Sequence, residues 1–183
     1  MSDTPKQNDV FAPVDVPLKN PPVAALLAWL WPGAGHIYQG RYGKGVLFMV
    51  CILATYFFGL AVGGGHVVYA SFRKPDVRYP YLAQVCVGLP ALPAIPQNWL
   101  VMDDKEPLFG SKLMAPPGQP VYEQEYDELA SWYKDHGFYF ELGTLYTMIA
   151  GLLNVLVIFD AYSGPMFTSP YPNRGDPPTE KEK

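Results

Sequence analysis

The chain alternates long apolar stretches with short groups of charged residues. Four runs of 18 to 28 residues contain no Asp, Glu, Lys or Arg, and charged residues bound each run on both sides. A helix needs about 20 apolar residues to cross the hydrocarbon core of a bilayer. The pattern therefore predicts an all-α integral membrane protein with three or four transmembrane helices. It argues against an ordinary soluble domain, whose charges are spread over its helix and strand surfaces.

The four runs predict helices of different quality. Segments 45–62 and 142–159 are long apolar runs without charged residues, which is typical of transmembrane helices. Segment 23–40 contains Pro32 and Gly33 in its middle, so it is expected to be a kinked helix or a short helix followed by a re-entrant bend. Segment 79–102 carries four prolines, and we expect its first half to be helical and residues 91–97 to form turns. That segment either crosses the membrane or dips into it.

These elements assemble into a membrane domain in two parts. The first part is residues 23–102, which comprise a helical hairpin over 23–62 and the proline-broken segment 79–102. The second part is the final transmembrane helix, 142–162. The turn that joins the first two apolar segments is only a few residues long, so we expect them to pack as antiparallel neighbours.

The rest of the chain is polar and lies outside this domain. Residues 1–22 and 163–183 are expected to be flexible or disordered tails, because their polar, proline-containing composition cannot bury enough apolar surface. The loop 103–141 is acidic. Within it, aromatic and apolar residues recur at helical spacing over 121–136, which predicts an amphipathic surface helix.

Composition narrows the function classes. Only 16% of the residues are charged, against about 25% in an average soluble domain. The net charge is −4, and no basic stripe suggests a nucleic-acid partner. Both cysteines, Cys51 and Cys86, lie inside apolar stretches and outside any C-x-x-C pattern, so we expect neither a disulfide framework nor a thiol-based metal or haem site.

The most pointed local motif is the glycine-rich turn P-G-A-G-H-I-Y-Q-G-R-Y-G-K-G. Glycine loops can cradle phosphate groups, but this spacing matches neither the dinucleotide fingerprint nor the P-loop. Small residues also let two helices approach closely, and we prefer this role. Arg41 and Lys44 would then meet lipid headgroups at the membrane interface. The expected helix-packing residues of the turn are Pro32, Gly33, Gly35, Tyr38, Gly40, Gly43 and Gly45.

This turn and the final helix resemble a known family. An apolar helix that runs into G-x-G-x-x-Y-x-G-R, followed by a second apolar helix, is similar to the bacterial TM-two domain. The matching residues are Gly33, Gly35, Tyr38, Gly40 and Arg41, with Asp160 as the match to the family's Asp-bearing helix end. The chain departs from that pattern in the long insertion before Asp160 and in Ile37, where the family has an aromatic residue. It also looks like an uncharacterised family of small bacterial membrane proteins. The resemblance implies a bacterial inner-membrane location and no defined activity.

Four polar side chains within or at the ends of apolar segments are candidate functional residues, because burying them in a membrane is costly. They are His36, Gln84, Asn154 and Asp160. For Asn154 we prefer a hydrogen bond to a neighbouring helix over an ion or substrate site. For Asp160 we prefer an ion pair with a Lys or Arg near the interface.

Motifs for chemistry are missing. The sequence contains no G-x-S-x-G and no H-E-x-x-H. His36 and His66 are separated by a whole predicted span, which disfavours a three-histidine metal site with His136. We therefore expect no catalytic, cofactor-binding or metal-binding residues, and no enzyme.

Two functions remain. The first is a non-catalytic scaffold or accessory subunit of a membrane complex, whose partners are the bilayer and other membrane proteins or further copies of the chain. The alternative is a small oligomeric transporter or channel-like element. Convergence of the four polar side chains on a cavity would favour transport, whereas Asn154 bonded to backbone would favour the scaffold. With four spans, eight of the 13 Lys and Arg residues share the side of the tails, which predicts cytoplasmic termini of a multi-pass inner-membrane protein.

Overall fold

The structure is a computed structural model that describes residues 19–72, 77–103, 105–109, 113–117 and 128–164. Within these residues every regular element is a helix, which confirms the expected all-α class. The elements are α1 (Pro21–Leu30), α2 (Ala34–Tyr38), α3 (Tyr42–Val62), α4 (Pro80–Gln84), the 3-10 helix η2 (Val85–Val87), α5 (Ala94–Met102), α6 (Glu128–His136) and α7 (Phe138–Ser163).

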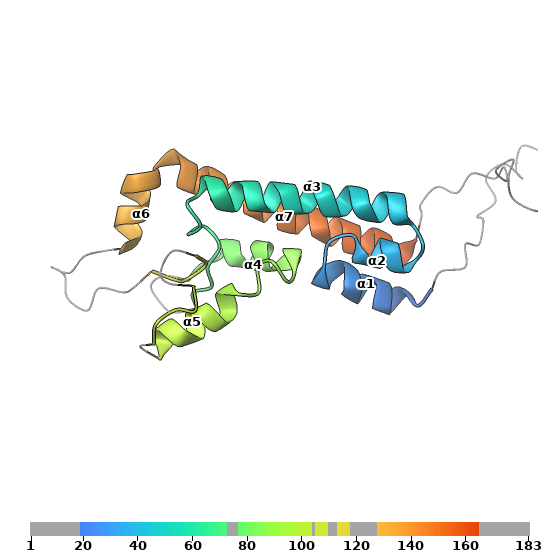
Figure 1. Cartoon of the computed structure of the whole chain (residues 1–183), viewed down its shortest axis with the longest axis horizontal. Helices are drawn as coiled ribbons and strands as arrows, with labels where there is room; N and C mark the ends of the chain where they lie inside the picture. Colours follow the sequence, from blue (N-terminus) through green and yellow to red (C-terminus); the bar gives the residue numbers. More distant parts are fainter. Residues whose placement is uncertain (1–18, 73–76, 104, 110–112, 118–127, 165–183) are drawn as a thin grey trace, which may run out of the picture.

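Two helices, α3 and α7, are long and apolar enough to cross a membrane. They have 21 and 26 residues, and the mean hydropathy over the most apolar 18 residues is 2.3 in α3 and 2.0 in α7. They run side by side along the long axis of the molecule (Figure 1). Near one end Gly59 of α3 lies against Gly143 of α7. Small residues at this crossing let the two backbones approach closely.

The other two expected spans are broken, so the described residues contain two long apolar helices rather than three or four. In the first broken segment α1 ends at Leu30 and the chain reverses into α2, with Gly33 at a φ of +82°. This is the second of the two alternatives expected for Pro32 and Gly33.

In the second broken segment the helix α4–η2 is followed by a turn and by α5. The expected turn-rich stretch ends early, because α5 already begins at Ala94. Pro93 is the N-cap of α5 and Pro96 lies in its first turn. Proline is tolerated there because the first amides of a helix have no partner within the helix.

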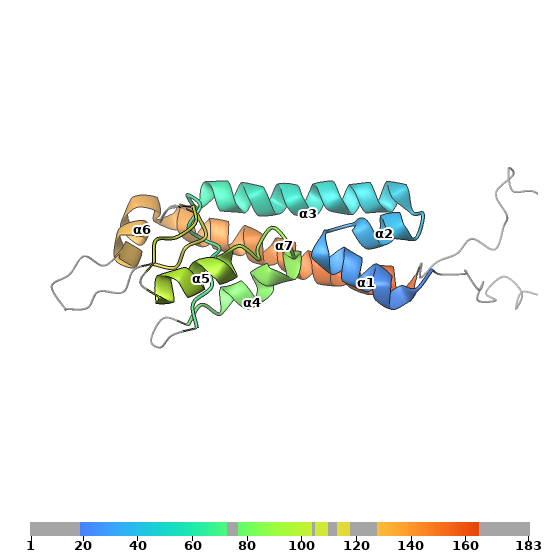
Figure 2. The same ribbon diagram turned by 60° about the horizontal axis from the view of Figure 1, so that its bottom comes forward.

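Helices α1 and α4–η2 lie end to end along α7 (Figures 1 and 2). They approach from opposite ends of the molecule and meet with their carboxyl ends near its middle. The Leu89 amide donates to the Leu30 carbonyl oxygen at 3.0 Å. Gly88, with a φ of +88°, turns the chain at this junction, and a Cβ there would collide with the Trp29 carbonyl oxygen. The junction therefore requires glycine.

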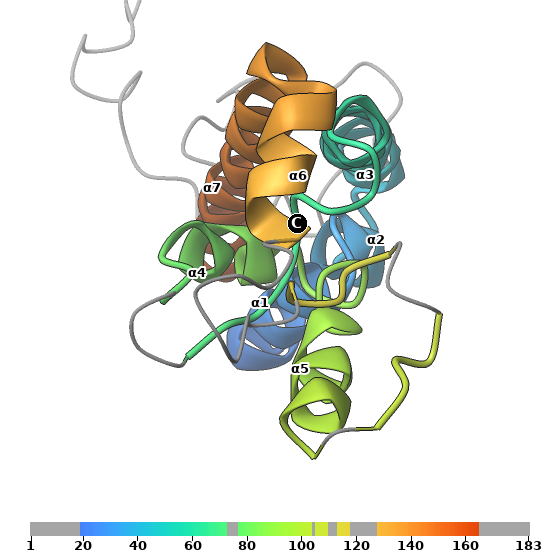
Figure 3. The same ribbon diagram turned by 90° about the vertical axis from the view of Figure 1, so that its left-hand side faces the viewer.

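The remaining helices, α5 and α6, lie at the end of the molecule where α7 begins (Figure 3). The amphipathic helix was expected over 121–136. The structure has α6 from Glu128, and residues 121–127 lie outside the described residues. Trp132 of α6 is buried and joins the main hydrophobic core. Most of both predicted tails also lies outside the described residues, although α1 begins at Pro21, inside the first predicted tail.

Candidate functional site

One face of α7 carries a row of buried small and polar residues. Thr144, Thr147 and Asn154 are buried on this face, and Gly151 lies between them against α4. The spacing of three, four and three residues keeps all four on one side of a helix. This row faces the broken helices, so it is where unpaired backbone groups need partners.

Asn154 is the last residue of the row and is fully buried. Its Nδ2 donates to the Ala28 carbonyl oxygen in α1 at 3.1 Å and to the Cys86 carbonyl oxygen in η2 at 2.8 Å. Carbonyl groups in the last turn of a helix have no partner within the helix. One amide group therefore ties the carboxyl ends of two broken helices to α7.

A second group of hydrogen bonds lies nearer the start of α7. Gln84 is buried, and its Nε2 donates to the Thr147 Oγ1 at 2.8 Å and to the Val67 carbonyl oxygen at 3.1 Å. Arg78 donates to the same Val67 carbonyl at 3.2 Å and to the Thr144 Oγ1 at 3.0 Å. The chain that follows α3 is thereby fastened to both α4 and α7.

At the opposite end of α7, Asp160 lies in a cluster of donors and positive charges. Its Oδ2 is 2.6 Å from the His36 Nε2, 3.6 Å from the Arg41 Nη1 and 3.9 Å from the Lys44 Nζ. The side-chain Nε2 of Gln39 donates a further hydrogen bond to the Ala161 carbonyl oxygen at 2.6 Å. These contacts bind the α2 turn and the start of α3 to the end of α7.

His36 is the buried member of this cluster. Its side chain is fully buried, and its Nδ1 has no hydrogen-bond partner among the described residues. A protonated imidazole would leave a buried N–H without an acceptor, whereas the neutral tautomer leaves only a lone pair unpaired. We therefore assign His36 as a neutral donor to Asp160. With one carboxylate facing Arg41 and Lys44, the cluster keeps a net positive charge.

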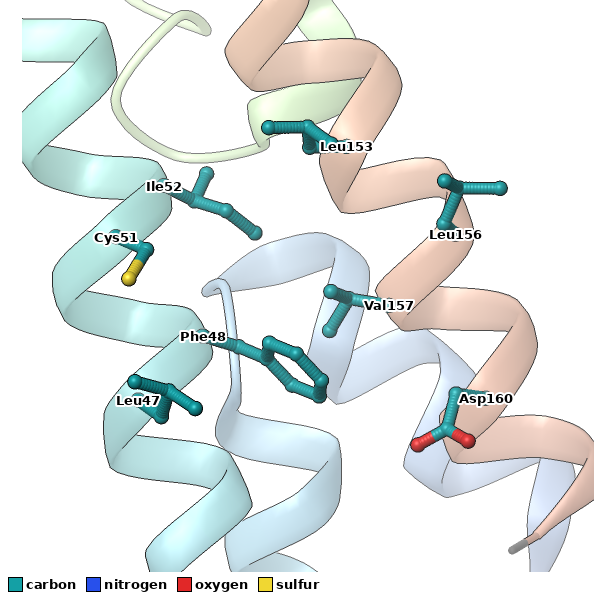
Figure 4. A pocket seen from close by; sticks show the side chains of 8 residues that line it. All are labelled: Leu47, Phe48, Cys51, Ile52, Leu153, Leu156, Val157 and Asp160. Atoms are coloured by element: carbon teal, nitrogen blue, oxygen red, sulfur yellow. The ribbon is translucent and has the colours of Figure 1, made fainter. Parts of the chain in front are cut away.

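Beside this cluster α3 and α7 enclose a groove of about 490 Å³, which we call the α3–α7 groove (Figure 4). Its lining is apolar except for Asp160 at one end. The lining residues are Leu47, Phe48, Cys51, Ile52, Leu153, Leu156, Val157 and Asp160. The Phe48 ring also packs edge-on against the His36 imidazole, at 5.1 Å between centroids. The Asp160 cluster and the groove therefore share a wall.

The glycine-rich turn makes close contacts at some of its positions and not at others. A Cβ on Gly35 would collide with the Ala24 carbonyl oxygen of α1, and one on Gly33 would collide with the Gly45 carbonyl oxygen of α3. A Cβ on Gly40 or Gly43 would have no heavy atom within 4 Å. Pro32 is buried, and the ring of Tyr38 lies 5.7 Å from the Lys19 Nζ.

The four polar candidates do not converge on one cavity. His36 and Asp160 contact each other, whereas Asn154 and Gln84 each bind a different backbone segment. Sequence reasoning missed the roles of Arg78, Thr144 and Thr147. The two threonines could have been found from the small and polar residues that recur every three or four positions in the final apolar segment. No sequence pattern indicated that Arg78 contacts Val67 and Thr144.

The two other histidines, His66 and His136, lie close to each other. The rings of His66 and His136 lie 6.3 Å apart, and His66 stacks on Trp132 at 4.3 Å. In the part of the chain that the structure describes, no group of three or more His, Cys, Asp or Glu side chains is arranged to hold a metal ion. The pair therefore contributes to the aromatic packing around α6.

Comparison with known proteins identifies a family without an assigned role. The model described as "Family of unknown function (DUF6677)" matches residues 23–173. No curated protein and no solved structure matched the chain. The family match agrees with the expected resemblance to an uncharacterised family and carries no information on the TM-two domain.

Proposed function

Since the chain belongs to the DUF6677 family, whose function is unknown, we propose that it is a non-catalytic integral membrane protein that acts as a scaffold or accessory subunit of a membrane complex. One observation carries the proposal. The buried amide of Asn154 is bonded to the carbonyls of Ala28 and Cys86. A side chain whose donors are both used to hold backbone has a packing role.

The two long helices support residence in a membrane. Helices α3 and α7 cross the bilayer, and the segments α1–α2 and α4–α5 enter it from opposite faces and turn back near the middle. Backbone that is not helical is tolerated at this depth only where protein covers it. The hydrogen bonds from Asn154 and Gln84 to backbone carbonyls provide such cover.

In the proposed topology both termini lie on one face of the membrane. Arg41 and Lys44 contact Asp160, so they lie on the same face as the end of α7. With two crossings, that face carries seven of the 13 Lys and Arg residues and the other face six. Four spans would have put eight of the 13 basic residues on the side of the tails, whereas two crossings divide them almost equally. The count therefore no longer predicts which face is cytoplasmic, and we propose only that the two termini share a face.

Cysteine labelling tests this topology. In a chain with Cys51 and Cys86 replaced by Ala, a membrane-impermeant maleimide should react with Lys19→Cys and Ser163→Cys from the same side. It should react with Glu128→Cys from the other side only. Reaction of the first two variants from opposite sides would refute the two-crossing arrangement.

The alternative function, a small transporter, has weaker support. Broken helices that meet within a membrane are a feature of transporters. In those proteins, however, polar groups at the break face a substrate or an ion. Here the donors at the break bind backbone carbonyls, and the groove between the two long helices has an apolar lining.

Isolation from the native membrane tests the scaffold proposal. The full chain carries a C-terminal tag, is extracted in two mild detergents, and is analysed by quantitative mass spectrometry. The control is a tagged membrane protein of similar size and expression. We expect one membrane protein to accompany the chain at a fixed ratio in both detergents. A chain that elutes as a defined homo-oligomer without another protein, and that supports solute flux in liposomes, would replace the scaffold with the transporter.

A further inference from the structure

The α3–α7 groove has the dimensions of a site for one hydrocarbon chain. Its volume of about 490 Å³ lies within the range of about 300–1,000 Å³ that is usual for small-ligand sites. Along α7 it extends from Leu153 to Asp160, which is about 10 Å at the rise of an α helix. Seven of its eight lining residues are apolar or a thiol. The groove therefore suits an apolar ligand that is narrow and short.

The length of the groove argues against a helix as its occupant. A membrane-spanning helix from a second copy of the chain would pack along about 30 Å. The groove covers about a third of that length and ends at a charged cluster. A flexible acyl chain needs no longer contact, and the surrounding bilayer supplies such chains at high concentration.

The end of the groove at Asp160 attracts an anion. Arg41 and Lys44 lie within 4 Å of this carboxylate, and Lys19 lies over the nearby Tyr38 ring. Two positive charges thus face the one negative charge of Asp160, because His36 is a neutral donor. The Lys44 side chain is 51% exposed and is available to a phosphate. The Arg41 side chain is 19% exposed, and its buried Nη2 has no hydrogen-bond partner among the described residues.

We propose that the chain binds one anionic phospholipid specifically, with an acyl chain in the α3–α7 groove and its phosphate held by Arg41 and Lys44. An apolar groove that ends at surplus positive charge matches a ligand with a hydrocarbon chain and a negative headgroup. The inference rests on the proposed membrane residence but not on the scaffold role. It adds a defined lipid site to a surface that would otherwise make only general headgroup contacts.

Native mass spectrometry of the purified full chain tests the site. Phosphatidylglycerol and phosphatidylcholine with identical acyl chains are titrated separately. We expect one phosphatidylglycerol to bind saturably, with phosphatidylcholine weaker by about fivefold or more, since each interfacial Lys or Arg contributes on the order of 1 kcal/mol toward an anionic lipid. Equal binding of the two lipids would overturn the proposal.

Two matched pairs of variants locate the lipid. Cys51→Trp fills the groove, whereas Val50→Trp places the same ring on an exposed neighbouring position outside it. We expect the first variant to weaken binding at least about tenfold and the second to leave it unchanged. Lys44→Gln should reduce the preference for the anionic lipid, and Lys134→Gln at the other end should not. Equal effects within either pair would refute the assignment.

A competition experiment separates the lipid from its headgroup. Glycerol phosphate, which lacks the acyl chains, should not displace bound phosphatidylglycerol at millimolar concentration. Displacement would mean that the basic cluster is a phosphate site without a role for the groove. A dimer that forms with loss of bound lipid would mean that a second copy fills the groove. Because these measurements use the chain without a partner, their failure is distinguishable from failure of the scaffold proposal.

Discussion

Replacing Asn154 should destabilise the junction between the two broken helices. In Asn154→Leu both donated hydrogen bonds are lost, and the Ala28 and Cys86 carbonyls remain buried without this donor. A typical hydrogen bond contributes about 1 kcal/mol in soluble proteins, and about 0.6 kcal/mol on average between membrane helices. The two bonds together therefore contribute about 1–2 kcal/mol to the free energy of unfolding.

This loss is large enough to measure in detergent. For a chain of this size, 1 kcal/mol shifts Tm by about 2–4 °C, so Asn154→Leu should lower Tm by about 2–8 °C. In the assay, the purified protein is heated to a series of temperatures, and the fraction that stays folded is measured by size-exclusion chromatography. Leu152→Ala is the matched control, because Leu152 lies on the same helix, is 54% exposed and does not line the α3–α7 groove. Its Tm should change by less than that of Asn154→Leu.

Asn154→Asp sharpens the test. A carboxylate has nearly the shape of the amide but donates no hydrogen bond when ionised. It should also destabilise the protein, because an ionised carboxylate would face two carbonyl oxygens and a protonated carboxyl can donate only one of the two hydrogen bonds. If both variants unfold at the temperature of the unmodified chain, the row of buried polar groups on α7 does not hold the broken helices, and the scaffold proposal loses its main support.

Two further substitutions test the two ends of the α1–α2–α3 hairpin. Gly35→Leu should lower the detergent-extracted yield sharply, since its side chain would meet the α1 backbone. Gly43→Leu is the control and should give the normal yield, because a Cβ there meets nothing within 4 Å. Equal yields of the two variants would contradict the close packing of Gly35 against α1. Asp160→Asn should lower Tm by about 2–4 °C, as for loss of a partly exposed ion pair of about 1 kcal/mol. Asp103 and Lys105 form an ion pair in which both side chains are exposed, so Asp103→Asn should leave Tm unchanged. A larger Tm shift for Asp103→Asn than for Asp160→Asn would contradict the role given to the Asp160 cluster.

Hydropathy predicted the two long helices because each is one uninterrupted apolar run. The same criterion overcounted spans at Pro32 and Gly33 and at the prolines of the third segment. A run without charges measures how much chain can be buried, not whether one helix contains it. At Gly88 the chain turns so closely against Trp29 that only the tertiary structure reveals the need for glycine.

The candidate residues were predicted as individual side chains, and their partners were not. His36 and Asp160 were both selected for their polarity within or beside apolar segments, yet 124 residues separate them. No local pattern connects positions so far apart. Asn154 was expected to bond a neighbouring helix, and the structure adds that it bonds two helix ends at once. The role of Arg78 could not be predicted from the sequence, because it depends on where α7 lies.

The contacts of Asn154 also set an order for biogenesis. Asn154 is 126 residues later in the chain than Ala28 and 68 residues later than Cys86. At about 5–20 residues per second, a ribosome needs roughly 6–25 s to add the 126 residues. Until then α1 and α4–η2 have been synthesised without the donor that joins them. Formation of α7 must therefore be the step that joins the two broken helices, and a nascent chain arrested before it would carry both of them without this donor.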